Sequence, residues 1–200
     1  MTGVDGRGPT VLDRVWSPRG ELVLRETDGR FEIISNGVFL MDTSDGTSER
    51  LLVDAVVARA ASPAPRLLIG GLGVGFSLVR AVAYGHLAAV DVVEIETAVI
   101  DWHRRYLRHL TGAAFADPRV RVIAADVRDW LARTADRYDA ICLDTDNGPG
   151  WLVTAANAEL YAERGMELAA RRLRPGGLLA VWSAHRDPGY ERRLRDRFGE

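Results

Sequence analysis

Short apolar segments alternate with longer amphipathic segments over the last two thirds of the chain, and this alternation constrains the fold most. Near-continuous apolar strands between helices are typical of a parallel sheet that is covered on both faces. The sequence therefore predicts an α/β fold with a Rossmann-like, doubly wound parallel sheet. The expected strands are residues 67–69, 88–95, 120–123, 138–143 and 178–182, and the expected helices are residues 74–84, 98–110, 128–133, 155–173 and 190–198.

The first part of the chain predicts a separate antiparallel sheet. The dipeptides Asp28-Gly29 and Asn36-Gly37 lie between alternating or apolar segments. Both dipeptides favour type I′ turns, because the two central positions of such a turn need a positive φ. We expect a β meander of three strands within residues 10–46, followed by a larger domain, residues 47–200. The expected strands of the meander are residues 21–26, 30–34 and 38–41.

A glycine loop follows the first strand of the larger domain, with Gly70, Gly71, Gly73 and Gly75 directly before a helix. Glycines there let the backbone turn tightly and approach a nucleoside, and the helix N-terminus favours polar or anionic groups. A dinucleotide fingerprint, G-x-G-x-x-G from Gly71, would need a glycine at Phe76. The spacing is instead G-x-G-x-G, which favours a ligand of the S-adenosylmethionine (SAM) type. NAD, and a turn that binds nothing, are the alternatives.

Two acidic residues stand where such a ligand would need them. Glu94 ends the second strand about 20 residues past the loop, where a carboxylate binds ribose hydroxyls. Asp126 follows the third strand, at the sheet edge where open α/β sheets bind ligands, and we expect it to accept a hydrogen bond from the adenine amino group. The alternative for Asp126 is the N-cap of the next helix.

Composition excludes several other classes of function. The 26 basic residues are all arginines, so lysine Schiff-base chemistry and a P-loop are excluded. One cysteine and 4 scattered histidines predict no metal site. A net charge of −2 without a basic cluster predicts neither nucleic-acid nor membrane binding, and no apolar run approaches a membrane span. Without a signal peptide or a disulfide framework, we expect a cytoplasmic protein.

Further segments follow one another along the chain: Leu67-Leu-Ile-Gly-Gly71, Val93-Glu-Ile-Glu96, Asp117-Pro-Arg-Val120, Asp126, Tyr138-Asp-Ala-Ile-Cys-Leu-Asp144, Leu160-Tyr161 and Leu173-Arg-Pro-Gly-Gly-Leu178. Their order and spacing resemble the spermidine synthase (polyamine aminopropyltransferase) family, which belongs to the SAM-dependent methyltransferase-like superfamily. The resemblance implies a small β domain before a domain of the class I SAM-methyltransferase type. It also implies a transferase of polyamine biosynthesis that moves an aminopropyl group from decarboxylated SAM to a small-molecule amine, and a homodimer.

In that family, an Asp after the fourth strand begins a D-x-x-D-P loop that closes over the substrates, and Asp144 matches this Asp. The resemblance implies that Asp144 is the catalytic residue, which orients the attacking amine and accepts its proton. A loop-initiating Asp is the structural alternative. We expect Asp146, Asn147 and Trp151 to contact the substrate, although Trp151 can equally pack against the next helix.

The chain also departs from the family pattern. The family loop reads G-G-G-D-G-G, and its Asp holds the amine of the aminopropyl group; Gly73 stands at that position here. Asn147 replaces the second Asp of D-x-x-D-P, and residues 48–53 lack the Tyr and His of a D-E-x-x-Y-H segment that helps bind polyamine. The family fold ends with two further strands, which we expect this chain to lack.

These departures leave two alternatives open. The first is a SAM-dependent methyltransferase of a small molecule, which the loss of the amine-holding Asp favours. The second is a non-catalytic homologue that retains nucleoside binding. Residues 101–105 are expected to form the solvated face of a helix, so His103 is not expected to take part in catalysis.

Overall fold

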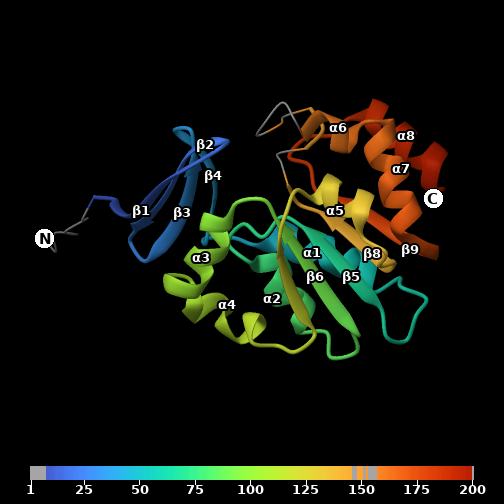
Figure 1. Cartoon of the computed structure of the whole chain (residues 1–200), viewed down its shortest axis with the longest axis horizontal. Coiled ribbons are helices and arrows are strands. Elements are labelled where there is room, and N and C mark those ends of the chain that lie inside the picture. Colours follow the sequence, from blue (N-terminus) through green and yellow to red (C-terminus); the bar gives the residue numbers. More distant parts are fainter. Residues whose placement is uncertain (1–7, 146–147, 151, 153–156, 200) are drawn as a thin grey trace, which may run out of the picture.

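Two sheets organise the molecule, a small antiparallel sheet near the N-terminus and a larger parallel sheet (Figure 1). The structure is a computed structural model that describes residues 8–145, 148–150, 152 and 157–199. The N-terminal sheet pairs its strands in sequence order. They are β1 (Thr10–Ser17), β2 (Gly20–Thr27), β3 (Arg30–Ser35) and β4 (Val38–Asp42).

Tight turns join β2 to β3 and β3 to β4. Asp28 and Asn36 have a φ of 50°, and the glycine after each has a φ of 78°. Positive φ at both central positions is the geometry predicted for Asp-Gly and Asn-Gly, so both hairpins are confirmed. The prediction of three strands is wrong, because β1 pairs along β2. A bulge between Val11 and Asp13 breaks the alternation by which a strand is recognised in a sequence.

The larger sheet has five parallel strands in the order β7-β6-β5-β8-β9. The predicted doubly wound α/β fold is therefore confirmed. Because β5 is followed by strands on one side and then by β8 on the other, the strand order reverses between β5 and β8. Ligands of open α/β sheets bind at such a switch point. The strands are β5 (Arg66–Gly70), β6 (Ala89–Glu94), β7 (Val120–Ala124), β8 (Tyr138–Leu143) and β9 (Leu173–Val181).

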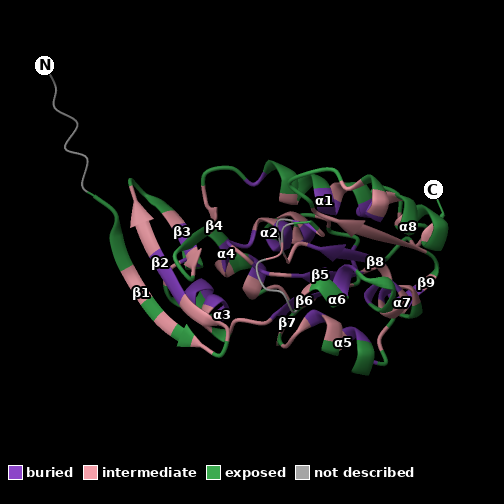
Figure 2. Ribbon diagram, turned by 90° about the horizontal axis from the view of Figure 1, so that it is seen from above, coloured by how far each residue is buried: buried purple, intermediate pink, exposed green. Residues whose placement is uncertain are grey.

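Helices cover both faces of this sheet (Figure 2). The buried hydrophobic residues form two cores. The helices of the first core are α1 (Thr47–Val57), α2 (Phe76–Val82), α3 (Thr97–Arg105) and α4 (Arg108–Phe115). The helices of the second core are α5 (Val127–Arg133), α6 (Ala158–Tyr161), α7 (Glu163–Arg172) and α8 (Pro188–Phe198).

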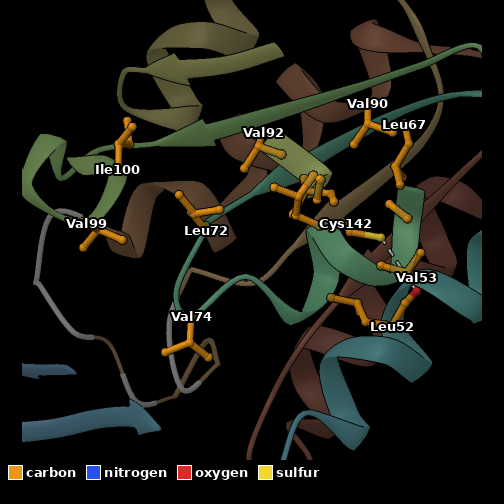
Figure 3. Packing of buried hydrophobic residues seen from close by; sticks show 14 of the residues in the cluster. Leu52, Val53, Leu67, Leu72, Val74, Val90, Val92, Val99, Ile100 and Cys142 are labelled. Atoms are coloured by element: carbon orange, nitrogen blue, oxygen red, sulfur yellow. Dashed lines mark hydrogen bonds between the residues drawn. The ribbon is translucent and has the colours of Figure 1, made fainter. Parts of the chain in front are cut away.

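Alternation along the strands sends side chains to the two cores in turn. Leu67 and Ile69 of β5 enter the first core, and Leu68 enters the second. Figure 3 shows part of the first core, where Leu67 and Cys142 lie close to Leu52 and Val53 of α1. These strands are apolar on both faces, which explains why they could be recognised in the sequence.

Two helices expected to be continuous are each divided. The helix expected over residues 98–110 is α3 and α4, because the N–H groups of Tyr106 and Leu107 both bond to the carbonyl of Trp102, at 2.7 and 2.9 Å. Of the helix expected over residues 155–173, the described part is α6 and α7, with Ala162 extended between them (ψ 174°).

The expected solvated face over residues 101–105 is wrong for two residues. Trp102 and His103 are each 1% exposed. Trp102 Nε1 donates to Asp13 Oδ2 of β1 at 2.9 Å, and Tyr106 Oη donates to the carbonyl of Leu12 at 3.2 Å. The N-terminal sheet is thus fixed against α3, which the local sequence pattern did not indicate. The expected domain boundary after residue 46 stays a prediction.

In the described part of the chain, each helix is too short or too polar to cross a membrane.

Candidate functional site

The glycine loop begins where β5 ends and brings the backbone close to the end of β8. Gly71 has a φ of +96°, and a Cβ added to it would lie 2.1 Å from the carbonyl oxygen of Asp144. The Asp144 N–H donates to the carbonyl of Gly70 at 2.8 Å. A glycine is required at position 71 for both its conformation and this approach.

A cavity of about 230 Å³ opens beside this loop, at the carboxyl ends of the strands. Five of the predicted site residues line it: Gly71, Gly73, Glu94, Asp126 and Asp144. The structure therefore brings together residues from the ends of β5, β6, β7 and β8.

Two of the remaining predicted residues are glycines of the described part of the chain. Gly70 is the buried last residue of β5, and Gly75 precedes α2 with a φ of +92°, so neither lines the cavity. Asp146, Asn147 and Trp151 lie outside the described residues, and their substrate contacts stay predictions.

Glu94 is 7% exposed and reaches the glycine loop. Its Oε2 accepts from the Leu72 N–H at 2.8 Å, and its Oε1 accepts from the Glu96 N–H at 2.8 Å. Burial raises the pKa of this carboxyl above its ordinary value, and the backbone donors partly oppose that shift. A carboxylate oxygen can accept more than one hydrogen bond, so Glu94 retains capacity for a pair of ligand hydroxyls.

Asp126 is the N-cap of α5. Its Oδ1 accepts from the N–H of Arg128 at 2.7 Å and from that of Asp129 at 3.4 Å. The capping alternative for Asp126 is therefore confirmed. The same side chain lines the cavity, so an additional contact to adenine stays a prediction that the cap does not contradict.

Asp144 follows β8 and faces the cavity beside α2. Ser77 Oγ donates to its Oδ2 at 3.2 Å. Burial, and after it the negative charge of Glu49, raise the pKa of the Asp144 carboxyl to about 7, against an opposing effect of the hydrogen bond from Ser77. A carboxyl that titrates near neutral pH in a cleft is typical of a functional site.

Glu49 is a cavity residue that the sequence analysis missed. It lies in the first turn of α1, and its carboxylate accepts from Ser48 Oγ at 2.8 Å. Comparing residues 48–53 with the family's D-E-x-x-Y-H segment drew attention to the missing Tyr and His. Glu49 matches the Glu of that segment, and this match was the signal that could have identified it.

Arg19 was also missed, because it lies in the turn after the unrecognised strand β1. Its Nε donates to Glu96 Oε1 at 2.5 Å, and its Nη2 donates to the carbonyl of Ile95 at 3.0 Å. The guanidinium lines the cavity near Glu94 and therefore offsets part of the acidic charge at that end.

The N-terminal sheet supplies an apolar wall to the cavity, formed by Leu22, Ile33, Leu40 and Met41. A Cβ added to Gly73 would lie 2.3 Å from Met41 Sδ, so a thioether covers the loop there. Counting G-x-G-x-G from Gly71 aligns the family's loop Asp with Val74, which is 1% exposed. Neither alignment provides a loop carboxylate.

The described residues contain no group of three or more potential metal ligands. The hydrogen-bond donors and acids around the cavity suit a nucleoside and a cationic group instead. The strand order and this cavity place the chain in the class of Rossmann-like α/β proteins whose ligands bind at the switch point.

The family is identified by comparison with known proteins. The chain belongs to the spermine/spermidine synthase domain family, whose model matches residues 47–194. The resemblance noted in the sequence is therefore confirmed.

Curated relatives carry out two kinds of transfer. The chain is 31% identical over 157 residues to putrescine N-methyltransferase 2 of Nicotiana attenuata, covering 77% of this chain and 38% of that protein. It is 28% identical over 156 residues to polyamine aminopropyltransferase 2 of Pseudomonas aeruginosa, covering 76% of this chain and 42% of that protein. The chain thus spans well under half the length of these relatives.

Solved structures share the fold. A spermidine synthase in complex with the transition-state analogue AdoDATO matches with a TM-score of 0.77 and 18% identity, over 95% of this chain and 66% of that one. The spermidine synthase of Thermotoga maritima matches with a TM-score of 0.75 and 18% identity, over 95% of this chain and 65% of that one. Both sheets are therefore typical of the family fold.

We predict that Gly71→Ala destabilises the chain by about 2 kcal/mol or more, because the new methyl group would clash with the Asp144 carbonyl at a positive φ. Gly85→Ala is the control, since an added Cβ there meets nothing within 4 Å. The measurement is urea unfolding at one pH. Equal midpoints for the two variants would contradict the close approach of β5 and β8.

We predict that the stability of the chain falls between about pH 4 and pH 7 through Asp144. The unfolded carboxyl has a pKa near 3.8 and the folded one about 7, so over this interval the unfolded state binds fewer protons. Asp144→Asn removes this term while its amide oxygen can still accept from Ser77.

Urea unfolding at pH 5 and at pH 8 gives the free energy of unfolding of Asp144→Asn and of the wild type. We expect the variant's free energy of unfolding, relative to the wild type, to be about 1–3 kcal/mol higher at pH 8 than at pH 5. If the difference in unfolding free energy between the variant and the wild type is the same at both pH values, Asp144 does not titrate in this range.

Proposed function

We propose that this chain transfers an alkyl group from a SAM-type sulfonium to an amine, and that the group is aminopropyl, carried by decarboxylated SAM. The observation that carries the proposal is Asp144, a carboxylate poised near neutral pH in the same cavity as the glycine loop and Glu94. The family membership supports it. The acceptor would be a small-molecule amine.

The nucleoside would bind along the ends of β5, β6 and β7. Glu94 would accept hydrogen bonds from the ribose hydroxyls, the backbone at Gly71 and Gly73 would form one wall of the nucleoside site, and Asp126 would accept from the adenine amino group. Each of these residues lines the cavity. Strands lie about 4.8 Å apart and β5 separates β6 from β8, so the carboxylates of Glu94 and Asp144 follow strand ends roughly 10 Å apart.

Asp144 would prepare the acceptor amine. A free alkylamine has a pKa near 10 and is protonated at neutral pH, whereas attack requires its lone pair. Asp144 and Glu49 would attract the cation, and the Asp144 carboxylate would accept its proton. The nitrogen then bonds to the carbon beside the sulfonium, and the C–S bond breaks with its electron pair moving to sulfur. The product on sulfur is a neutral thioether.

Methyl transfer from intact SAM is the second candidate, and a specific observation favours it. Neither Gly73 nor Val74 provides a carboxylate to hold the amine of an aminopropyl group, and Met41 covers Gly73. The putrescine N-methyltransferases among the relatives support this candidate. A non-catalytic homologue that binds nucleosides is the third. Homodimer formation and a cytoplasmic location stay predictions.

The identity of the nucleoside product separates these functions. We expect the purified chain, given decarboxylated SAM with putrescine or spermidine, to release methylthioadenosine and an aminopropylated amine, measured by mass spectrometry. Release of S-adenosylhomocysteine from SAM would establish methyl transfer instead. Asp144→Asn should lower turnover by about 100-fold or more, because the proton acceptor is lost. Nucleoside binding without either product would identify a non-catalytic homologue.

We predict that Glu94→Ala weakens the binding of methylthioadenosine by about 2 kcal/mol, or roughly 30-fold, through the loss of charge-assisted hydrogen bonds to ribose. Calorimetric titration with methylthioadenosine, SAM, decarboxylated SAM and NAD measures this and tests the choice of ligand. Glu167→Ala removes an exposed carboxylate of α7 and serves as the control. Unchanged affinity in Glu94→Ala would remove Glu94 from the site.

A further inference from the structure

His103 is a buried titratable side chain that the proposed chemistry does not use. It lies in α3, is 1% exposed, and its ring stacks on that of Phe115 with centroids 5.3 Å apart. It does not line the cavity beside the glycine loop. Its two ring nitrogens face different elements, which raises the question of what the ring holds in place.

One ring nitrogen contacts the glycine loop. His103 Nε2 lies 2.8 Å from the carbonyl oxygen of Gly73, whose φ is +50°. The other nitrogen, Nδ1, lies 2.9 Å from Thr111 Oγ1 of α4. His103 therefore connects the glycine loop to α4.

These partners determine the tautomer. A carbonyl oxygen can only accept, so Nε2 carries the proton and donates to Gly73. Nδ1 then accepts from the Thr111 hydroxyl, whose single proton is turned to the ring at 2.9 Å instead of to the Leu107 carbonyl, which lies 3.1 Å away. Burial lowers the pKa of His103 to about 4, which keeps the ring neutral at physiological pH. A neutral ring with a fixed tautomer is a directional hydrogen-bond donor to the loop.

The loop is held on several sides by one continuous segment of the chain. Glu94, at the end of β6, accepts from the Leu72 N–H. His103 lies in α3, the helix that follows β6, and donates to the carbonyl of Gly73, the residue after Leu72. Below the loop, a Cβ on Gly75 would lie 2.5 Å from Thr111 Cγ2 and 3.0 Å from His103 Cε1. The loop conformation thus depends on the β6–α3–α4 segment.

We propose that His103 is a positioning residue, which holds the glycine loop in the conformation that receives the nucleoside through its Nε2–H bond to the Gly73 carbonyl. The inference rests on the proposed function, in which the nucleoside binds at this loop. It concerns the loop and not the reacting atoms, because His103 reaches the site through the backbone of Gly73.

Two amide variants separate the roles of the two nitrogens. In His103→Gln, the side-chain amide nitrogen can take the place of Nε2 and donate to the Gly73 carbonyl. The side chain of His103→Asn is too short to reach Gly73, and its amide can contact only Thr111. Both variants lose the ring and its stacking on Phe115. They therefore share the loss of the ring, and they differ by one methylene group and by the bond to the loop.

We expect His103→Gln to bind methylthioadenosine within about threefold of the wild type, and His103→Asn to bind about tenfold more weakly, as for one lost hydrogen bond. The two variants should have similar melting temperatures. In turnover, His103→Asn should raise the KM for the donor more than it lowers kcat. Equal affinities in the two variants, or losses that follow the melting temperature alone, would overturn the assignment.

Further measurements keep the inference testable. If neither variant folds, Thr111→Val removes the hydroxyl that fixes the tautomer and keeps the methyl group below Gly75; we expect about threefold weaker binding, and unchanged binding would overturn the inference. If the wild type binds no nucleoside, the proposed function fails. Amide hydrogen exchange over residues 72–75 then still tests whether His103 holds the glycine loop. We expect faster exchange in His103→Asn than in His103→Gln.

Discussion

The close approach of two strand ends is the constraint on which the rest of the site depends. The backbones of Gly71 and Asp144 meet so closely that position 71 has no room for a side chain, and the Asp144 N–H bonds to Gly70. This contact lies where the strand order reverses, so it sets the cavity at the switch point. It also fixes the position of the Asp144 carboxylate relative to the glycine loop, which a longer side chain at position 71 would push away.

Charge is distributed unequally around the cavity. The acids near β6 and β7 have partners, since Glu94 accepts from two backbone N–H groups, Glu96 pairs with Arg19, and Asp126 caps α5. Asp144 has a neutral donor, Ser77, and lies within the field of Glu49. One end of the cavity is therefore compensated, whereas the other would be stabilised by a bound cation. This polarity is consistent with a nucleoside at the first end and a protonated amine at the second.

Sequence reasoning succeeded where the signal is local. The strands are apolar on both faces, the glycine loop is contiguous, and Glu94 and Asp144 each follow a recognisable strand. It failed where a residue acts through distant partners. Arg19 and Met41 reach the cavity only because the N-terminal sheet folds over α3, and His103 is buried because the glycine loop packs on it. The bulge in β1 concealed that strand, and with it the turn that carries Arg19.

Among the described residues, one departure from the family pattern, Gly73, lies in the wall of the cavity. The end of the cavity proposed to bind the nucleoside retains the glycines, Glu94 and Asp126, whereas no acid stands at Gly73 and Met41 of the N-terminal sheet covers it. The sheet that closes the cavity is also the part of the described chain that lies before the matched family domain. Under the proposed function, substitutions in this wall would change the selectivity for the transferred group, while Asp144 and the strand ends would preserve the chemistry. Under the proposed function, the donor's tail, rather than its nucleoside, would be the part of the ligand whose recognition differs from the family pattern.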